Sequence, residues 1–343
     1  MNPARSSAIA APQAVSMSRP MRRGVPFAPE LALIAAGLAL FWLLPGDLGL
    51  LSNVAGMSLL ALSLNLVIGQ AGIASMGHAA LFGAGGYTAG LIALHASPNP
   101  LVGLVAGGIA GLLVAVVSGA VVLRVRGLAQ VMLTIASAQL LLELANWARS
   151  LTGGDDGLTG FSIAPLLGVF EFDFEGKTAF LYTLSVLVVA FFGLRKLVAS
   201  PFGLTTRAIQ LDAGRVEALG GRVFLHLLAV YAVGGFVAGL AGAVMTQTTK
   251  VASLSMLDFH LSASVLIMVV LGGTSRLSGA LLGAVVYMSI HHLASNLSPH
   301  HWLLAIGILL IATMMYLPGG LVQLLQVVRR RPLLDVAHGG KKP

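Results

Sequence analysis

The chain has 343 residues, of which 57% are hydrophobic and only 9% are charged. A soluble domain carries about 25% charged residues, so this composition excludes a soluble globular protein. The sequence has no cysteine, which excludes disulfides, thiolate metal sites and cysteine nucleophiles. The formal net charge is +8, but in a membrane protein Lys and Arg mark cytoplasmic loops, so the charge does not indicate a nucleic-acid partner.

Long apolar runs recur along the sequence and predict an all-α polytopic membrane protein with about ten transmembrane helices. Residues 1–27 contain four arginines and a short apolar run broken by Pro12, which predicts a disordered cytoplasmic tail rather than a signal peptide. The membrane domain is predicted over 28–328, and a basic cytoplasmic tail over 329–343. The predicted spans are roughly 29–46, 50–69, 78–96, 101–123, 127–147, 178–196, 223–247, 259–272, 279–296 and 302–326.

The basic residues predict the orientation of these spans. With a cytoplasmic N-terminus and alternating spans, all of the 20 Lys and Arg residues lie inside except Arg149, Lys177 and Lys250. This bias predicts that both chain ends are cytoplasmic. One long loop, 148–177, then lies outside and carries five acidic residues, and another, 197–222, lies inside. Two large loops on opposite faces indicate two different partners.

Glycines four residues apart predict close helix packing. Gly103, Gly107 and Gly111 have this spacing, and so do Gly235 and Gly239. Small residues at this spacing allow helix backbones to approach closely in lipid. We therefore expect these glycines at helix–helix contacts.

The stretch GQAGIASMGHAALFGAGGY, residues 69–87, places six glycines between two apolar runs. Irregular backbone at membrane depth is tolerated where it packs in protein or lines a wet cavity, so the stretch fits a broken helix on a solute pathway. A tight cytoplasmic turn, with His78 starting the next helix, fits equally well. The first interpretation predicts that polar side chains near the break face those of the fifth span across the pathway. These residues are Asn65, Gln70, Ser75 and His78, with Thr134, Ser137 and Gln139 opposite.

The sequence also bears on how transport would be powered. It has no GxxxxGK[ST] phosphate loop, so any ATP must be hydrolysed by another chain. An ion-coupled transporter would need a relay of buried ionisable groups, but Glu143 is the only acidic residue clearly inside a predicted span. No Gly-x-Ser-Gly turn of an intramembrane protease is present, and the His291-His292 pair has no acidic cluster beside it, so no metal or cofactor is predicted.

Loop 197–222 is predicted to form an amphipathic helix. Ser200 can cap a helix whose first residue is Pro201, Gly214 is expected to split it, and Gly220 to end it. One face of this helix is apolar, and an apolar face outside the membrane must be covered by a protein partner or by the lipid interface. The residues on this face are Leu204, Ala208, Leu211, Ala218 and Leu219.

Five segments together carry a family resemblance. They resemble, in the right order, the signature stretch, external loop, cytoplasmic loop and C-terminal part of the M-type permease subunit of branched-chain amino-acid ABC importers. The segments are LSLNLVIGQAGIASMGHAALFGAGGYTAG (62–90), WARSLTGGDDGLTGF (147–161), SPFGLTTRAIQLDAGRVEALG (200–220), MVVLGGTSRLSGALLGA (268–284) and YLPGGL (316–321).

The resemblance implies one half of a heterodimeric channel in the bacterial inner membrane, itself not an enzyme. Its implied partners are an H-type permease subunit, two ABC ATPase subunits and a periplasmic solute-binding protein. The solute would be a branched-chain or related amino acid. Urea, short amides and aromatic acids remain alternatives within the family, and an ion-coupled secondary transporter is the alternative from another class.

The resemblance also assigns roles to residues of the two large loops. The cytoplasmic loop would couple the chain to the ATPases through Arg207, Asp212, Arg215, Glu217, Ala218 and Gly220. In the external loop, Arg149, Asp155 and Asp156 would dock the solute-binding protein. The alternative is a solvated loop held by its own turn at 152–154.

Overall fold

The computed structural model describes residues 46–165 and 176–297, together with isolated positions between 35 and 42 and between 304 and 322. The regular elements in this part of the chain are all helical. They are α2 (Leu48–Asn65), the π-helical turn η1 (Leu66–Gln70), α3 (His78–His95), α4 (Pro100–Val122), α5 (Leu128–Trp147), α6 (Arg149–Thr152), η2 (Gly154–Asp156), α7 (Lys177–Ala199), α8 (Pro201–Leu211), α9 (Ala213–Ala218), α10 (Val223–Thr249), η3 (Leu254–Leu257), α11 (Phe259–Gly272) and α12 (Leu277–Leu297).

Six of the described helices are long and apolar enough to cross a membrane, namely α2 with η1, α4, α5, α7, α10 and α12. The apolar helix α11 is shorter, and α3 occupies the third predicted span. The predicted spans from 50 to 296 therefore coincide with helices. The spans 29–46 and 302–326 lie largely outside the described residues, as do both tails, so the count of ten stays a prediction.

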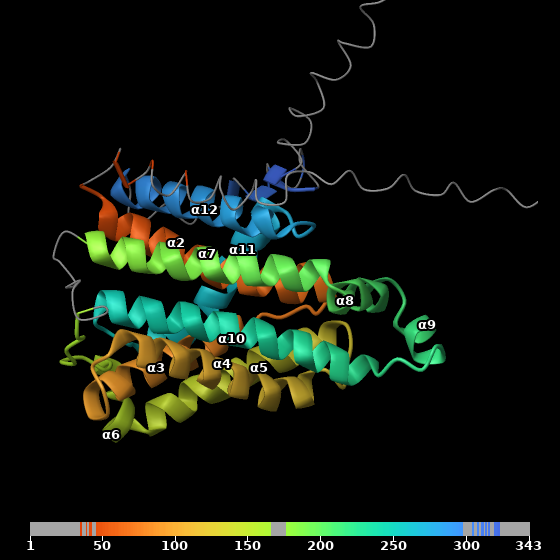
Figure 1. Cartoon of the computed structure of the whole chain (residues 1–343), viewed down its shortest axis with the longest axis horizontal. Coiled ribbons are helices and arrows are strands. Elements are labelled where there is room, and N and C mark those ends of the chain that lie inside the picture. The colour runs from red at the N-terminus through yellow and green to blue at the C-terminus, as the bar shows by residue number, and fades with distance from the viewer. Residues whose placement is uncertain are drawn as a thin grey trace, which may run out of the picture.

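The core is built around α2, α3, α4 and α10 (Figure 1). In the most apolar stretch of α2, 83% of the residues are buried within the chain. Glycines bring the helix backbones into contact, as the spacing predicted: a Cβ on Gly111 would meet the carbonyl oxygen of Gly235, and one on Gly239 would meet that of Gly107. The helices α4 and α10 therefore pack backbone to backbone.

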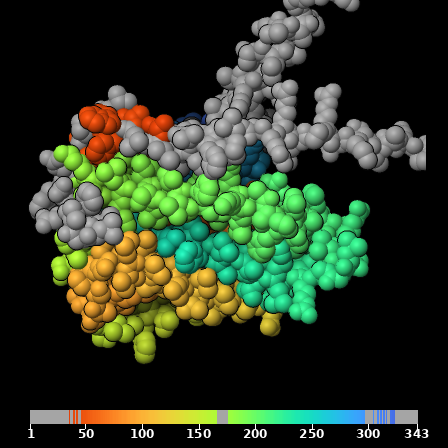
Figure 2. Space-filling model, in the orientation of Figure 1, coloured from red at the N-terminus to blue at the C-terminus, as the bar shows by residue number. Residues whose placement is uncertain are grey.

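The two ends of the bundle differ. Helices α8 and α9 project as a lobe from one end, which we call the α8 end (Figures 1 and 2). Arg126 and Glu217 meet at this end, and the loop after α11 approaches the end of η1 there. The opposite end, called the α6 end, carries α6, η2 and η3. There the backbones of Leu158 and Ala252 form an isolated antiparallel bridge.

Candidate functional site

The chain break between η1 and α3 lies inside the bundle. The backbone N–H of Met76 donates to Thr134 Oγ1 at 3.1 Å, and that of Ala79 donates to Ser262 Oγ at 2.9 Å. Thr134 is six residues into α5, or about 9 Å from its start at the α8 end. Non-helical backbone therefore reaches membrane depth, which favours the broken-helix interpretation, although His78 is also the first residue of α3.

A buried polar cluster surrounds this break. Ser63 Oγ donates to the carbonyl of Leu60 at 2.7 Å and lies 2.9 Å from His78 Nε2. Because the hydroxyl has one hydrogen, this network assigns the proton of the imidazole to Nε2 and leaves Nδ1 as an acceptor. Nδ1 has no hydrogen-bond partner among the described residues, and neither do the amide of Asn65 and the hydroxyl of Ser75.

All three unpartnered side chains are at most 2% exposed. A buried polar group without a partner costs about 1–3 kcal/mol, so the chain carries this cost at three places around one break. Such groups are suited to bind a polar molecule that enters from outside the chain. This placement agrees with the pathway predicted for Asn65, Ser75 and His78.

Gln70, another predicted pathway residue, contacts α8 at the edge of the break. It ends the π-helical turn η1, and its side chain is 3% exposed. Its Oε1 accepts a hydrogen bond from Arg207 Nε of α8 at 3.1 Å. Gln210, one turn further along α8, donates to the carbonyl of Gly69 at 3.3 Å. We call this contact between α8 and η1 the α8–η1 junction.

The opposite side of α8 is anchored to α10. Thr206 Oγ1 lies 2.9 Å from His226 Nε2, and the Phe202 and His226 rings are 4.4 Å apart between centroids. Helix α8 therefore connects the broken end of α2 to the first turn of the long helix α10. A displacement of α8 would reach both helices directly.

The segment after α8 corrects two expectations about loop 197–222. The helix is interrupted at Asp212 rather than at Gly214, because the Asp212 carboxylate caps α9 by accepting from the Arg215 backbone N–H at 3.2 Å. Ser200 precedes α8 as predicted, but its hydroxyl donates to the Leu197 carbonyl instead of capping the helix. The predicted stop is confirmed, since Gly220 has a φ of +85°.

The apolar face of the α8–α9 lobe is exposed. The side chains of Leu204, Leu211 and Leu219 are 64%, 87% and 89% exposed, and the end of α9 at Ala218 is exposed too. The charged residues have partners within the chain: Arg215 pairs with Asp212 at 2.8 Å, and Glu217 lies 4.0 Å from Arg126. The lobe thus presents leucines, framed by internally paired charges, to a partner.

A cavity of about 550 Å³ adjoins the lobe at the α8 end. It lies between the glycine-rich loop after η1, the α4–α5 connection, the lobe and the start of α10. Its walls are rich in hydrogen-bonding and charged groups, including Arg124, Arg126, Gln130, Gln210 and Glu217. The cavity adjoins the break, because Ala71, Gly72 and Ile73 form part of its wall.

The three predicted pathway residues of α5 do not share one face. Thr134 is buried against the break, and Ser137 is partly buried with its hydroxyl donating to the Thr134 carbonyl at 2.8 Å. Gln139 is exposed, and its amide donates to Glu143 Oε1 at 3.3 Å. Six of the seven predicted pathway residues therefore lie at or near the break, and Gln139 is the exception.

The external loop forms a compact turn at the α6 end. Thr152 is buried, accepts from the Gly154 N–H and donates to the Ala145 carbonyl, so the turn that the alternative to docking predicted at 152–154 is present. Asp155 and Asp156 are exposed in η2, and Arg149 is exposed beside them on α6. The three charged side chains are exposed on this turn, which both docking and a solvated loop would give, so docking stays a prediction.

A family model for the permease component of branched-chain amino acid transport systems matches residues 48–314. The chain belongs to this family. It is 25% identical to the high-affinity branched-chain amino acid transport system permease protein LivM of Escherichia coli (strain K12) over 310 residues, which cover 83% of this chain and 70% of that protein. The LivM protein of Salmonella typhimurium (strain LT2) is 26% identical with the same coverage. No solved structure matches the chain.

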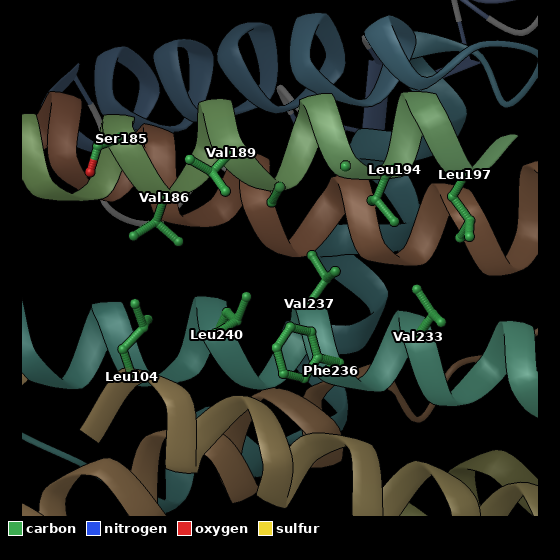
Figure 3. Close-up of a pocket in the computed structure, with 12 residues that line it drawn as sticks. Leu104, Ser185, Val186, Val189, Leu194, Leu197, Val233, Phe236, Val237 and Leu240 are labelled. Atoms are coloured by element: carbon green, nitrogen blue, oxygen red, sulfur yellow. The ribbon is translucent and has the colours of Figure 1, made fainter. Parts of the chain in front are cut away.

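Family membership makes the chain a multi-pass membrane permease component, and its other large groove does not suit a polar solute. This groove, of about 450 Å³, lies between α7 and α10, with Val186 and Val189 of α7 on one side and Val237 and Leu240 of α10 on the other (Figure 3). Ser185 supplies the one hydroxyl of its wall, and this hydroxyl already donates to the Tyr182 carbonyl at 2.7 Å. The permease therefore offers its polar groups at the break instead.

Sequence reasoning missed four residues of this site. Ser63 and Ser262 lie in apolar runs, where a serine gives no sign of its partner. Gln210 could have been suspected, because it lies three residues after Arg207 on the same side of α8, whereas no pattern in the sequence pointed to His226. Their partners, at Gly69 and Thr206, come from other parts of the chain and could not be read from spacing.

Proposed function

We propose that the chain is the membrane-spanning permease subunit of an ATP-driven importer in the bacterial inner membrane. It translocates branched-chain or related amino acids that a periplasmic binding protein delivers. It works with an H-type permease subunit and two ABC ATPase subunits, which hydrolyse the ATP, while this chain is non-catalytic. In this proposal the α8 end faces the cytoplasm and the α6 end faces the outside, as the distribution of basic residues predicts.

The α8–η1 junction is the observation that carries this proposal. The leucines of the α8–α9 lobe are exposed, and we propose that an ATPase subunit covers them rather than the lipid interface, because α8 also contacts the broken end of α2. When the ATPases close, they move α8 as a rigid body. Arg207 and Gln210 pass this movement to η1, a π-helical turn beside a glycine-rich loop. The broken end of α2 then shifts relative to α3.

The same shift exposes the polar cluster to the solute. An amino acid carries an ammonium, which can donate to the free Nδ1 of His78, and a carboxylate, which can accept from the amide of Asn65. Ser75 can serve either group. Ser137 and Thr134 line the opposite wall. Neutral groups of this kind bind weakly, as transport requires, because the solute must also leave.

The three charged residues of the external turn dock the binding protein. Arg149, Asp155 and Asp156 are exposed at the α6 end, where the solute arrives. Exposed charges of this kind set encounter rate and register, and their effect weakens with salt. They do not select the solute, so urea, a short amide or an aromatic acid remains compatible with this permease.

Ion-coupled transport is the proposal's rival from another class. Within the described membrane-spanning helices, Glu143 is the only acidic residue, and it lies near the α6 end of α5. One carboxylate on an exposed face does not form a relay across a membrane. The available groups therefore favour energy supplied through the α8–α9 lobe.

Purification from the native host tests the proposal. We expect two ATPase chains and a second permease to co-purify with this chain, and we expect the complex to hydrolyse ATP faster with solute-loaded binding protein. The isolated chain should bind no nucleotide. Purification as a lone chain, with uptake driven by an ion gradient, would reject the importer and favour the rival.

A further inference from the structure

We propose that the exposed face of α5 around Gln139 and Glu143 is the surface against which the second permease subunit packs. The inference rests on the proposed function and adds the location of the subunit contact. We call this surface the α5 face and define it by Met132, Ala136, Gln139, Leu140, Glu143 and Leu144, all of which are exposed. They recur every three or four residues and so form one stripe along the helix.

Helix α5 is the least buried of the membrane-crossing helices described. Only 17% of its most apolar stretch is buried within the chain, compared with 83% for α2. It lies toward the lower edge of the bundle in Figure 1, near α6. The described part of the chain therefore leaves most of its surface uncovered.

The neighbouring helix α4 provides an internal comparison. It is also poorly buried, at 28%, and its exposed stripe, called the α4 face, is wholly aliphatic. The α4 face consists of Val105, Ile109, Leu113, Val117 and Val121. Lipid tails cover such a surface at no cost. The α5 face differs in carrying an amide and a carboxylate.

The depth of these polar groups argues against lipid. Gln139 lies eight residues before the end of α5 at Trp147, or about 12 Å below that end, and Glu143 lies about 6 Å below it. Their mutual hydrogen bond uses one carboxylate oxygen of Glu143. The remaining donors and acceptors of the pair are exposed, and at the depth of Gln139 lipid offers them no partners, so protein or enclosed water must satisfy them there.

A second membrane-spanning subunit fits this requirement. From Met132 to Leu144 the α5 face extends about 18 Å along the helix, which only another transmembrane helix can cover at that depth. Hydrogen bonds between polar side chains join transmembrane helices, and the carboxylate calls for donors on the partner. A second copy of this chain fits poorly, since a two-fold contact would bring two Glu143 carboxylates together.

The contact also has a place in the transport cycle. The other side of α5 holds the break, through Thr134 and the backbone of Met76. A subunit seated on the α5 face is therefore one helix away from the polar cluster. The pathway would run beside α5, between the break and the second subunit.

Site-specific photo-crosslinking in the assembled complex tests the inference. A photoreactive residue is placed singly at Leu140 or Leu144 on the α5 face, and at Leu113 or Val117 on the α4 face as matched controls. We expect a covalent product with the second permease from the α5 positions and none from the α4 positions. Products from the α4 positions alone, lipid adducts alone from the α5 positions, or a product of two copies of this 35.2 kDa chain would each overturn it.

Two substitutions provide an independent measurement. Glu143→Gln keeps the hydrogen-bonding capacity, and we expect the amount of second permease recovered per chain to stay unchanged. Glu143→Leu removes that capacity, and we expect recovery to fall about threefold or more. A lipid-facing carboxylate predicts the opposite, because leucine would be neutral or favourable there. Co-purification of the ATPases is recorded in parallel, so that failure of the whole importer proposal is recognised separately.

Discussion

The α8–η1 junction predicts that two residues far apart in the sequence act as one unit in coupling. Arg207→Ala removes the donor to Gln70 Oε1, and Gln70→Met removes the acceptor while keeping the size of the side chain. Either change disconnects α8 from the broken end of α2. We expect both variants to assemble with the ATPases, because the exposed leucines of the α8–α9 lobe are untouched.

The magnitude follows from the burial of Gln70. Its side chain is 3% exposed, so loss of Arg207 leaves a buried acceptor without its donor. Because Arg207 itself is exposed, we take the lower part of the usual range, about 1–2 kcal/mol. At about 1.4 kcal/mol per tenfold change, this free energy corresponds to a loss of about 5- to 30-fold in the fraction of ATPase closures that also move η1.

The assay is ATP hydrolysis and solute uptake by the complete complex in proteoliposomes. We expect uptake to fall by about this factor, while ATP hydrolysis continues and loses its dependence on solute-loaded binding protein. Thr205→Ala is the matched control, since it shortens an exposed side chain of the same helix whose hydroxyl donates to the Pro201 carbonyl within α8 rather than to η1. The control variant should keep uptake and solute-stimulated ATP hydrolysis close to those of the parent.

A double variant tests whether the contact between Arg207 and Gln70 is itself responsible for the loss of uptake. Residues that act through one contact show non-additive effects, so the Arg207→Ala, Gln70→Met double variant should be no worse than either single variant. If Gln70→Met transports like the parent, or if the two effects add fully, the reasoning is refuted. Arg207 would then act by touching the ATPase alone.

Three further predictions concern packing, backbone shape and docking. Gly242→Ala places a methyl group against the backbone of α3, so we expect a loss of about 1–3 kcal/mol in stability, measured by thermal unfolding in detergent. Gly193→Ala is its control, because the space at that Cβ is open, and it should unfold at the parent's temperature or at a higher one. Gly220→Val puts a branched residue at a φ of +85°, which costs about 1–2 kcal/mol, and solute-stimulated ATP hydrolysis should drop while the chain still inserts. Replacing Asp155 and Asp156 by Asn should weaken stimulation by the binding protein and flatten its salt dependence, and unchanged stimulation would reject the docking role.

Much of the fold could be predicted because membrane helices are specified locally. The apolar runs end at glycine, proline or charged residues, so predicted spans such as 101–123 and 223–247 lie within a few residues of α4 and α10. The glycine spacing in α4 also identified a real backbone contact, since small residues at a helix interface have few other uses in lipid.

The parts that could not be predicted depend on contacts between distant residues. Nothing in the sequence around Gln70 indicates that its side chain meets Arg207, 137 positions later. The direction of Gln139 depends on which side of α5 the rest of the chain covers. Two local signals could have interrupted the helix of the lobe, the capping residue Asp212 and the flexible residue Gly214. The helix is interrupted at Asp212, because its side chain caps α9.

Uptake by purified components tests the central claim most directly. The chain is reconstituted with its second permease and the ATPases in proteoliposomes, solute-loaded binding protein is added outside, and accumulation of labelled leucine is measured with ATP inside. The account predicts accumulation that requires ATP, the ATPases and the binding protein together. Accumulation by this chain alone under a proton or sodium gradient, without ATP, would contradict it.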